Sequence, residues 1–195
     1  CTVLRKHLPE KYADVLKILD KVIEKMDSGY SALVFPDFVS QYGLESIDLS
    51  LKALKKYTVY GSSEFALREF YKKDFQKTLQ TAIQWSVDKN EHVRRLSSEV
   101  SRPRLPWSFK RNEIIKNPKH TSAILQNLKA DPSLYVRKSV ANHLNDISKD
   151  HPDYMLELVS TWDKSNDHTQ WIIKHACRTL IKKGHANTLK LFDVK

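Results

Sequence analysis

Three segments of similar sequence follow one another in the second half of this 195-residue chain, and they constrain its fold more than any other feature. Segments 88–102, 131–145 and 167–181 align without gaps, and their starts lie 43 and 36 residues apart. Each begins with Asp, has a β-branched residue five positions later and continues as a mixed polar and apolar helix. Helical pairs that repeat every ~40–47 residues are typical of HEAT-type proteins. The pattern predicts an all-α chain whose helical pairs stack into a superhelix (solenoid) with a concave groove.

The first half of the chain also shows helical spacing of its apolar residues, and strand-like alternation never runs far. We expect one repeat domain over residues 1–195, since the length suits one domain. An irregular bundle in which three helices resemble one another by chance is the alternative. Two helix starts are predicted from capping: Asn90 as an N-cap, and Asp131 as an N-cap with Pro132 at the first helical position. The other expected helices are Tyr12–Met26, Pro36–Gly43, Ser46–Tyr57, a short helix after Gly61, Phe75–Val87, Thr121–Leu128 and Pro152–Trp162.

Charge and composition narrow the class of partner and the compartment. The chain has 33 Lys and Arg against 23 Asp and Glu, a net charge of +10, which favours a polyanionic partner such as nucleic acid or an anionic membrane surface. Two Cys are too few for a disulfide framework, and we find neither a membrane-spanning apolar run nor a signal peptide, so a cytoplasmic protein is expected. Common phosphate-loop, zinc-protease and paired-Cys motifs are missing, and we therefore expect no metal or cofactor.

The loop after the first repeated helix has an unusual composition. It contains Arg102, Pro103, Arg104, Pro106 and Trp107. Each Pro fixes its own φ and restricts the residue before it, so the loop should hold two guanidinium groups and an indole in defined places. An anion and a flat group could both bind there. The alternative for Trp107 is a place in the core.

Three acids are candidates for chemistry, and each also has an ordinary structural explanation. Glu99, with an Arg on either side, could form a surface ion pair, and Glu64 in a first helical turn complements the helix dipole. Asp146 comes late in its helix, where the dipole disfavours an anion, so a cation such as Lys149 or a functional demand should compensate. Aligning the repeats places Glu99 over Asn142 and Arg178, which fits either a binding groove or a solvated face.

Four stretches resemble the DNA alkylation repair glycosylases with HEAT-like repeats, the AlkC/AlkD superfamily, and most closely its AlkC branch. They are SSEFALREF (62–70), VRRLSSEVSRPRLPW (93–107), VRKSVANHLNDISKDHPD (136–153) and WIIKHACRTLIKKG (171–184). The resemblance extends over about residues 4–192. Some AlkC-type proteins continue into an immunoglobulin-like C-terminal domain; these 195 residues are expected to form the repeat domain alone.

The resemblance implies hydrolysis of the N-glycosidic bond of cationic alkylated bases in base excision repair. The substrates would be 3-methyladenine and, for the AlkC type, 3-methylcytosine, in double-stranded DNA bound by a monomer. A non-catalytic HEAT-repeat module that binds DNA or serves as a protein scaffold is the alternative. The resemblance assigns the site residues as follows: Glu64, Glu99 and Asp146 as catalytic acids; Trp107 stacking on the damaged base; Arg102, Arg104, Lys138 and Lys149 contacting DNA phosphates.

Overall fold

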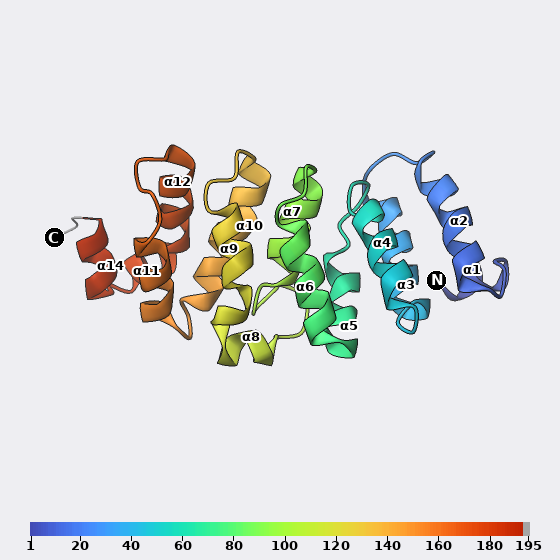
Figure 1. The fold of residues 1–195 in the computed structure, drawn as a ribbon, viewed down its shortest axis with the longest axis horizontal. Coiled ribbons are helices and arrows are strands. Elements are labelled where there is room, and N and C mark those ends of the chain that lie inside the picture. The colour runs from blue at the N-terminus through green and yellow to red at the C-terminus, as the bar shows by residue number, and fades with distance from the viewer. Residues whose placement is uncertain (193–195) are drawn as a thin grey trace. The chain divides into compact units, whose positions relative to one another are not determined.

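The chain is all-helical in the computed structural model, which describes residues 1–192, and this part of the chain contains no strand (Figure 1). The all-α prediction is therefore confirmed. None of the helices in residues 1–192 combines the length and the apolar character that a membrane span needs. The helices fall into two compact units, Cys1–Thr81 and a second unit that begins at Ala82, and each is described by itself. One domain over residues 1–195 stays a prediction.

In the first unit, α3 packs against α4 and α5, and α2 packs against α3 and α4. Apolar side chains that recur at helical spacing, such as Phe38, Leu54 and Phe70, are buried between these helices. The turn after α3 requires Gly43, because a Cβ there would collide with the hydroxyl groups of Tyr12 and Ser50. The elements are α1 (Thr2–Lys6), α2 (Tyr12–Ile23), η1 (Tyr30–Leu33), α3 (Val34–Tyr42), α4 (Ile47–Tyr57) and α5 (Glu64–Lys73), and α6 (Phe75–Trp85) spans the boundary.

In the second unit, the three repeated segments form α7, α10 and α12, and α10 packs against both of the others (Figure 1). Helices α9 and α11 also contact α10, so helical pairs stack as the repeat predicts. The concave groove stays a prediction. The elements are α7 (Glu91–Val100), α8 (Asn112–Lys116), η2 (Pro118–Thr121), α9 (Ser122–Leu128), α10 (Leu134–Ile147), α11 (Pro152–Ser160), α12 (Asp167–Ala176), α13 (Arg178–Lys182) and α14 (Ala186–Leu191).

Arg94 and Arg137 occupy the same position in two successive repeats and donate to equivalent backbone carbonyls. Arg94 donates through Nη1 to the carbonyl oxygens of residues 88 and 89 at 2.9 and 3.0 Å. Arg137 donates through Nη1 to the carbonyl oxygens of residues 131 and 132 at 2.9 and 2.7 Å. Each guanidinium thus satisfies carbonyls of the loop before its own helix, which supports a true structural repeat.

One of the two predicted helix starts is right and the other is wrong. Asn90 is the N-cap of α7, and its side chain accepts from the backbone N–H of residue 92 at 2.8 Å. Asp131 does not cap α10, which begins at Leu134 with Ser133 as N-cap. The carboxylate of Asp131 instead accepts from the Ser133 N–H at 2.9 Å and binds Arg94 Nε at 2.6 Å. Asp131 thus joins its own repeat to the preceding one through an ion pair with Arg94.

Candidate active site

Two of the predicted acids lie on neighbouring helices and share one arginine. Glu99 is near the end of α7, Asp146 is in the last turn of α10, and Arg102 follows α7. Arg102 donates through Nη1 to Glu99 Oε1 at 2.6 Å and through Nε to Asp146 Oδ2 at 2.9 Å. Its Nη2 also lies 2.9 Å from Asp146 Oδ2. The guanidinium therefore bridges the two carboxylates.

The other carboxylate oxygens of this pair are bound by further side chains. Ser139 donates through Oγ to Glu99 Oε2 at 2.6 Å, and Arg95 Nη2 lies 3.6 Å from the same oxygen. Lys149 donates through Nζ to Asp146 Oδ1 at 2.9 Å, so the compensating cation expected for Asp146 is present. Each of the four carboxylate oxygens thus has a partner within the protein. Ser139 is not among the site residues predicted from the sequence, although it lies two turns before Asp146 on the same helix face.

The bridged acids are buried. Glu99, Arg102 and Asp146 are 5%, 7% and 3% exposed. The ion pair considered for Glu99 is therefore present, with Arg95 and Arg102, but its expected location at the surface is wrong. Burial opposes the charge on Arg102, but the two carboxylates outweigh it and raise the pKa of the guanidinium above its usual value. Removing one partner from such a buried pair costs about 3–5 kcal/mol, because the remaining charge has no compensation. The arrangement therefore holds two fixed negative charges in one geometry.

The four side chains that are expected to contact DNA phosphates differ in their exposure and in their partners within the protein. Lys138 is exposed on α10, and Lys149 is exposed although it is bound to Asp146. Arg104 forms a partly exposed pair with Asp150 through Nε and Nη2 at 2.8–3.1 Å. Arg102 points at the acids instead, and its burial argues against a phosphate contact. Phosphate contacts through Arg104, Lys138 and Lys149 stay predictions.

The loop after α7 presents Trp107 to solvent. Its neighbours Pro103 and Leu105 are buried, and the Arg111 N–H donates to the Pro103 carbonyl at 3.0 Å, which closes the loop. Trp107 itself is 96% exposed, so the core position considered for it is wrong. It also has a φ of 59°, the left-handed region, which is strained for a bulky residue and is common at functional sites. An indole held in this way is available to a flat ligand.

Glu64, the third expected acid, lies in the first unit at the N-terminus of α5. It accepts a hydrogen bond from Ser62 Oγ at 2.6 Å and is half-buried. Its position in the first helical turn agrees with the helix-dipole explanation. Its participation in the active site stays a prediction.

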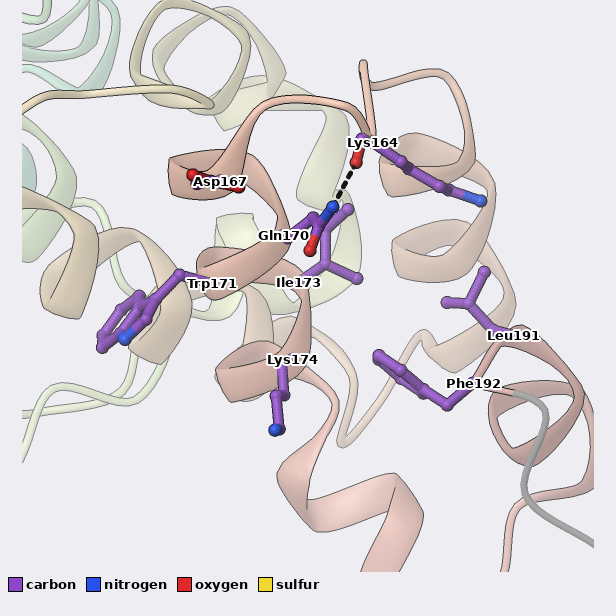
Figure 2. Close-up of a pocket in the computed structure, with 8 residues that line it drawn as sticks. All are labelled: Lys164, Asp167, Gln170, Trp171, Ile173, Lys174, Leu191 and Phe192. Carbon is purple, nitrogen blue, oxygen red and sulfur yellow. Dashed lines mark hydrogen bonds between the residues drawn. The ribbon is translucent and has the colours of Figure 1, made fainter.

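A cavity of about 450 Å³ lies beside α12 and α14, and its described lining contains none of the three acids (Figure 2). Figure 2 shows Leu191 and Phe192 on one side of α12, whereas the ring of Trp171 points away from them. The Gln170 amide donates to the Lys164 carbonyl at 2.7 Å at the edge of this cavity. Within residues 1–192, no group of three His, Cys, Asp or Glu side chains is placed to hold a metal ion.

Comparison with known proteins identifies related chains. A sequence profile described as DNA alkylation repair enzyme matches residues 47–180. The protein YhaZ of Bacillus subtilis strain 168 is 48% identical over 189 residues, which are 97% of this chain and 53% of YhaZ.

Two solved structures resemble the fold described above. Alkylpurine DNA glycosylase AlkC of Pseudomonas fluorescens, bound to DNA containing an abasic site analog, superposes with a TM-score of 0.92 at 50% identity. The match covers 95% of this chain and 52% of that one. AlkD2 of Streptococcus mutans has a TM-score of 0.53 at 21% identity over 88% of this chain and 91% of its own, and it supports the fold alone. The chain thus spans about half the length of YhaZ and AlkC.

Proposed function

Because the chain belongs to the DNA alkylation repair enzyme family, we propose that it is a DNA glycosylase that hydrolyses the N-glycosidic bond of cationic alkylated bases. The observation that carries the proposal is the buried pair Glu99 and Asp146, which Arg102 holds on two stacked helices. Trp107 stands exposed on the loop that continues from Arg102. An accessible aromatic ring attracts a flat cation through its face, and fixed carboxylates favour positive charge in a substrate.

Hydrolysis of this N-glycosidic bond does not require a strong general acid. A base that already carries a positive charge leaves readily, so the protein has to stabilise the oxocarbenium-like sugar and position a water molecule. Preorganised carboxylates can do both, because their charge is fixed before the sugar cation forms. Arg102 and Ser139 would act as positioning residues, since each donates to a carboxylate oxygen and so fixes its orientation.

We assign 3-methyladenine as the main substrate and 3-methylcytosine as a second one, in double-stranded DNA bound by a monomer in the cytoplasm. The net charge of +10 supports a polyanionic partner. The 50% identity to a protein described as an alkylpurine DNA glycosylase supports the purine substrate.

The proposal is tested by release of methylated bases. The protein is incubated with duplex DNA treated with dimethyl sulfate, and the released bases are separated by chromatography. We expect 3-methyladenine to be released faster than its spontaneous loss in buffer, and untreated DNA to yield no free base. Release that never exceeds the spontaneous rate would refute the glycosylase assignment.

One observation favours the alternative, a non-catalytic helical-repeat module that binds DNA or a protein. Every oxygen of Glu99 and Asp146 already has a partner in the protein, as is usual for structural ion pairs. A DNA-binding module would bind the methylated duplex without releasing its bases, and a protein scaffold would do neither. Measuring binding and release on the same duplex therefore separates the three cases.

Trp107→Ala should slow excision of 3-methyladenine without lowering the stability of the protein. Because the side chain is almost fully exposed, we expect the free energy of unfolding to change by less than ~0.5 kcal/mol. Stacking of a base on an aromatic ring contributes about 1–3 kcal/mol, so excision of 3-methyladenine should fall roughly tenfold or more. Tyr30→Ala, which removes another exposed aromatic ring, is the matched control and should leave excision unchanged. Equal excision rates for the two variants would remove Trp107 from the site.

A further inference from the structure

A second cavity, of about 280 Å³, lies where α10, α12 and α13 meet. Its described lining carries cationic, amide and aromatic groups and includes no carboxylate, which favours an anion. The lining residues are Lys138, Ala141, Asn142, Trp171, His175 and Arg178. Of these residues, Lys138 alone is predicted from the sequence to contact DNA.

Two side-chain pairs give this cavity a fixed geometry. Arg178 donates through Nη2 to Asn142 Oδ1 at 2.8 Å and through Nη1 to the His175 carbonyl at 2.7 Å. The rings of Trp171 and His175 are stacked, with centroids 3.7 Å apart and planes inclined by 18°. The His175 Nδ1–H donates to the Trp171 carbonyl at 2.9 Å, which fixes the imidazole over the indole. The site therefore combines an oriented guanidinium with an aromatic wall.

This cavity is electrostatically coupled to the bridged acids. Burial lowers the pKa of Arg178, while Asp146 raises it and Arg102 lowers it. The repeat alignment adds a separate relation, because Glu99 of the first repeat corresponds in position to Asn142 and Arg178 of the next two. Equivalent positions in the three repeats therefore carry a carboxylate at Glu99 on α7, an amide at Asn142 on α10 and a guanidinium at Arg178 on α13.

We propose that this cavity binds one backbone phosphate of the DNA strand that carries the damaged base, an inference that rests on the proposed glycosylase function. The Arg178 and Lys138 side chains supply the charged donors that a phosphate prefers, and Asn142 orients the guanidinium. The stacked rings of Trp171 and His175 line the same cavity and would lie beside the adjoining sugar or base. Glu99 at one end of these equivalent positions and a bound phosphate at the other would set the register of the strand over the carboxylates.

The test measures binding of a fluorescent duplex containing an abasic site analog over a range of salt concentrations. Arg178→Gln should weaken binding about tenfold and lower the slope of log affinity against log salt by about one, since one phosphate contact is lost. Lys174→Gln is the matched control, because Lys174 is exposed on α12 and lines the other cavity (Figure 2). It should leave the slope unchanged. Equal slopes for Arg178→Gln and the parent protein would overturn the proposal.

A neutral methylphosphonate linkage in the duplex tests the same contact without changing the protein. Placed in turn at each phosphate near the lesion, it should weaken binding of the parent protein about tenfold at one position of the damaged strand. At that position Arg178→Gln should show no further loss, because the two changes remove the same interaction. Independent, additive losses at every position would contradict the proposed site.

The two proposals fail in different ways. If the parent protein releases 3-methyladenine but Arg178→Gln keeps the parental salt slope, only the phosphate site is wrong. The opposite case is also distinguishable. If the parent protein releases no base, but Arg178→Gln lowers the salt slope and shows no further loss with the methylphosphonate, then the phosphate site stands and the glycosylase proposal is wrong.

Discussion

Glu99→Gln or Asp146→Asn should slow release of 3-methyladenine by about 10²–10³, the typical effect of losing one preorganised electrostatic group. Each substitution keeps the shape and most hydrogen bonds of the side chain but removes the charge that would stabilise the sugar cation. The rate is measured in single-turnover reactions on methylated duplex DNA, so that product release does not limit it. Affinity for DNA should not fall and should rise slightly, because a negative charge near the phosphates is removed.

Both substitutions should also affect stability. In a solvent-accessible groove they would change the free energy of unfolding by less than ~0.5 kcal/mol. Glu99 and Asp146 are buried and bonded to Arg102, so we expect a loss of about 1.5–3 kcal/mol, the contribution of a hydrogen bond between charged groups. The excision assay is therefore run well below the melting temperature of each variant.

The matched control is Glu157→Gln, which neutralises an exposed acid on α11 and should leave excision and stability unchanged. Glu64→Gln is expected to behave like the two buried acids if it belongs to the site. Variants of Glu99 and Asp146 that are folded and excise 3-methyladenine at the parental rate would show that the acids are structural.

The sequence predicts the helices of the second unit well because local signals agree with the repeat. Asn90 caps α7 as expected, and Asp146 has the cation three residues later that its place in the last helical turn demands. The predicted start of α10 at Asp131 and Pro132 is wrong, because these two residues also suit a turn before the helix. The ion pair of Asp131 with Arg94, 37 residues earlier in the chain, accompanies the later start.

The bridge at the centre of the site could not be predicted from local pattern. Arginine is rarely buried, and a Pro-rich basic loop suggests exposed guanidinium groups, so the sequence predicts a phosphate contact for Arg102 as it does for Arg104. The second acid that Arg102 binds, Asp146, lies 44 residues later in the chain on the next repeat. The two residues meet because α7 and α10 pack against each other. The burial of Arg102 between Glu99 and Asp146 depends on this packing.

Arg102→Met should therefore destabilise the protein strongly. As a bridge, Arg102 compensates two buried carboxylates, and its removal should lower the free energy of unfolding by about 3–5 kcal/mol. The salt slope of DNA binding should stay unchanged, because no phosphate contact is lost. A phosphate-binding Arg102 would give the opposite pattern, with normal stability and a slope lower by about one. Urea denaturation and salt-dependent anisotropy on the same variant decide between the two roles.

Arg104→Met is the matched control, since Arg104 lies two residues further along the same loop in a partly exposed pair with Asp150. Its removal should cost less than ~1 kcal/mol of stability, as exposed ion pairs contribute little. A third variant isolates the charges: combining Arg102→Met with Glu99→Gln and Asp146→Asn removes the uncompensated anions. Stability should then recover most of the loss seen with Arg102→Met alone, because neutral groups of similar volume can replace a buried ion network at little cost. A triple variant no more stable than Arg102→Met would show that packing of the Arg102 side chain, rather than its bridge between the acids, stabilises this part of the fold.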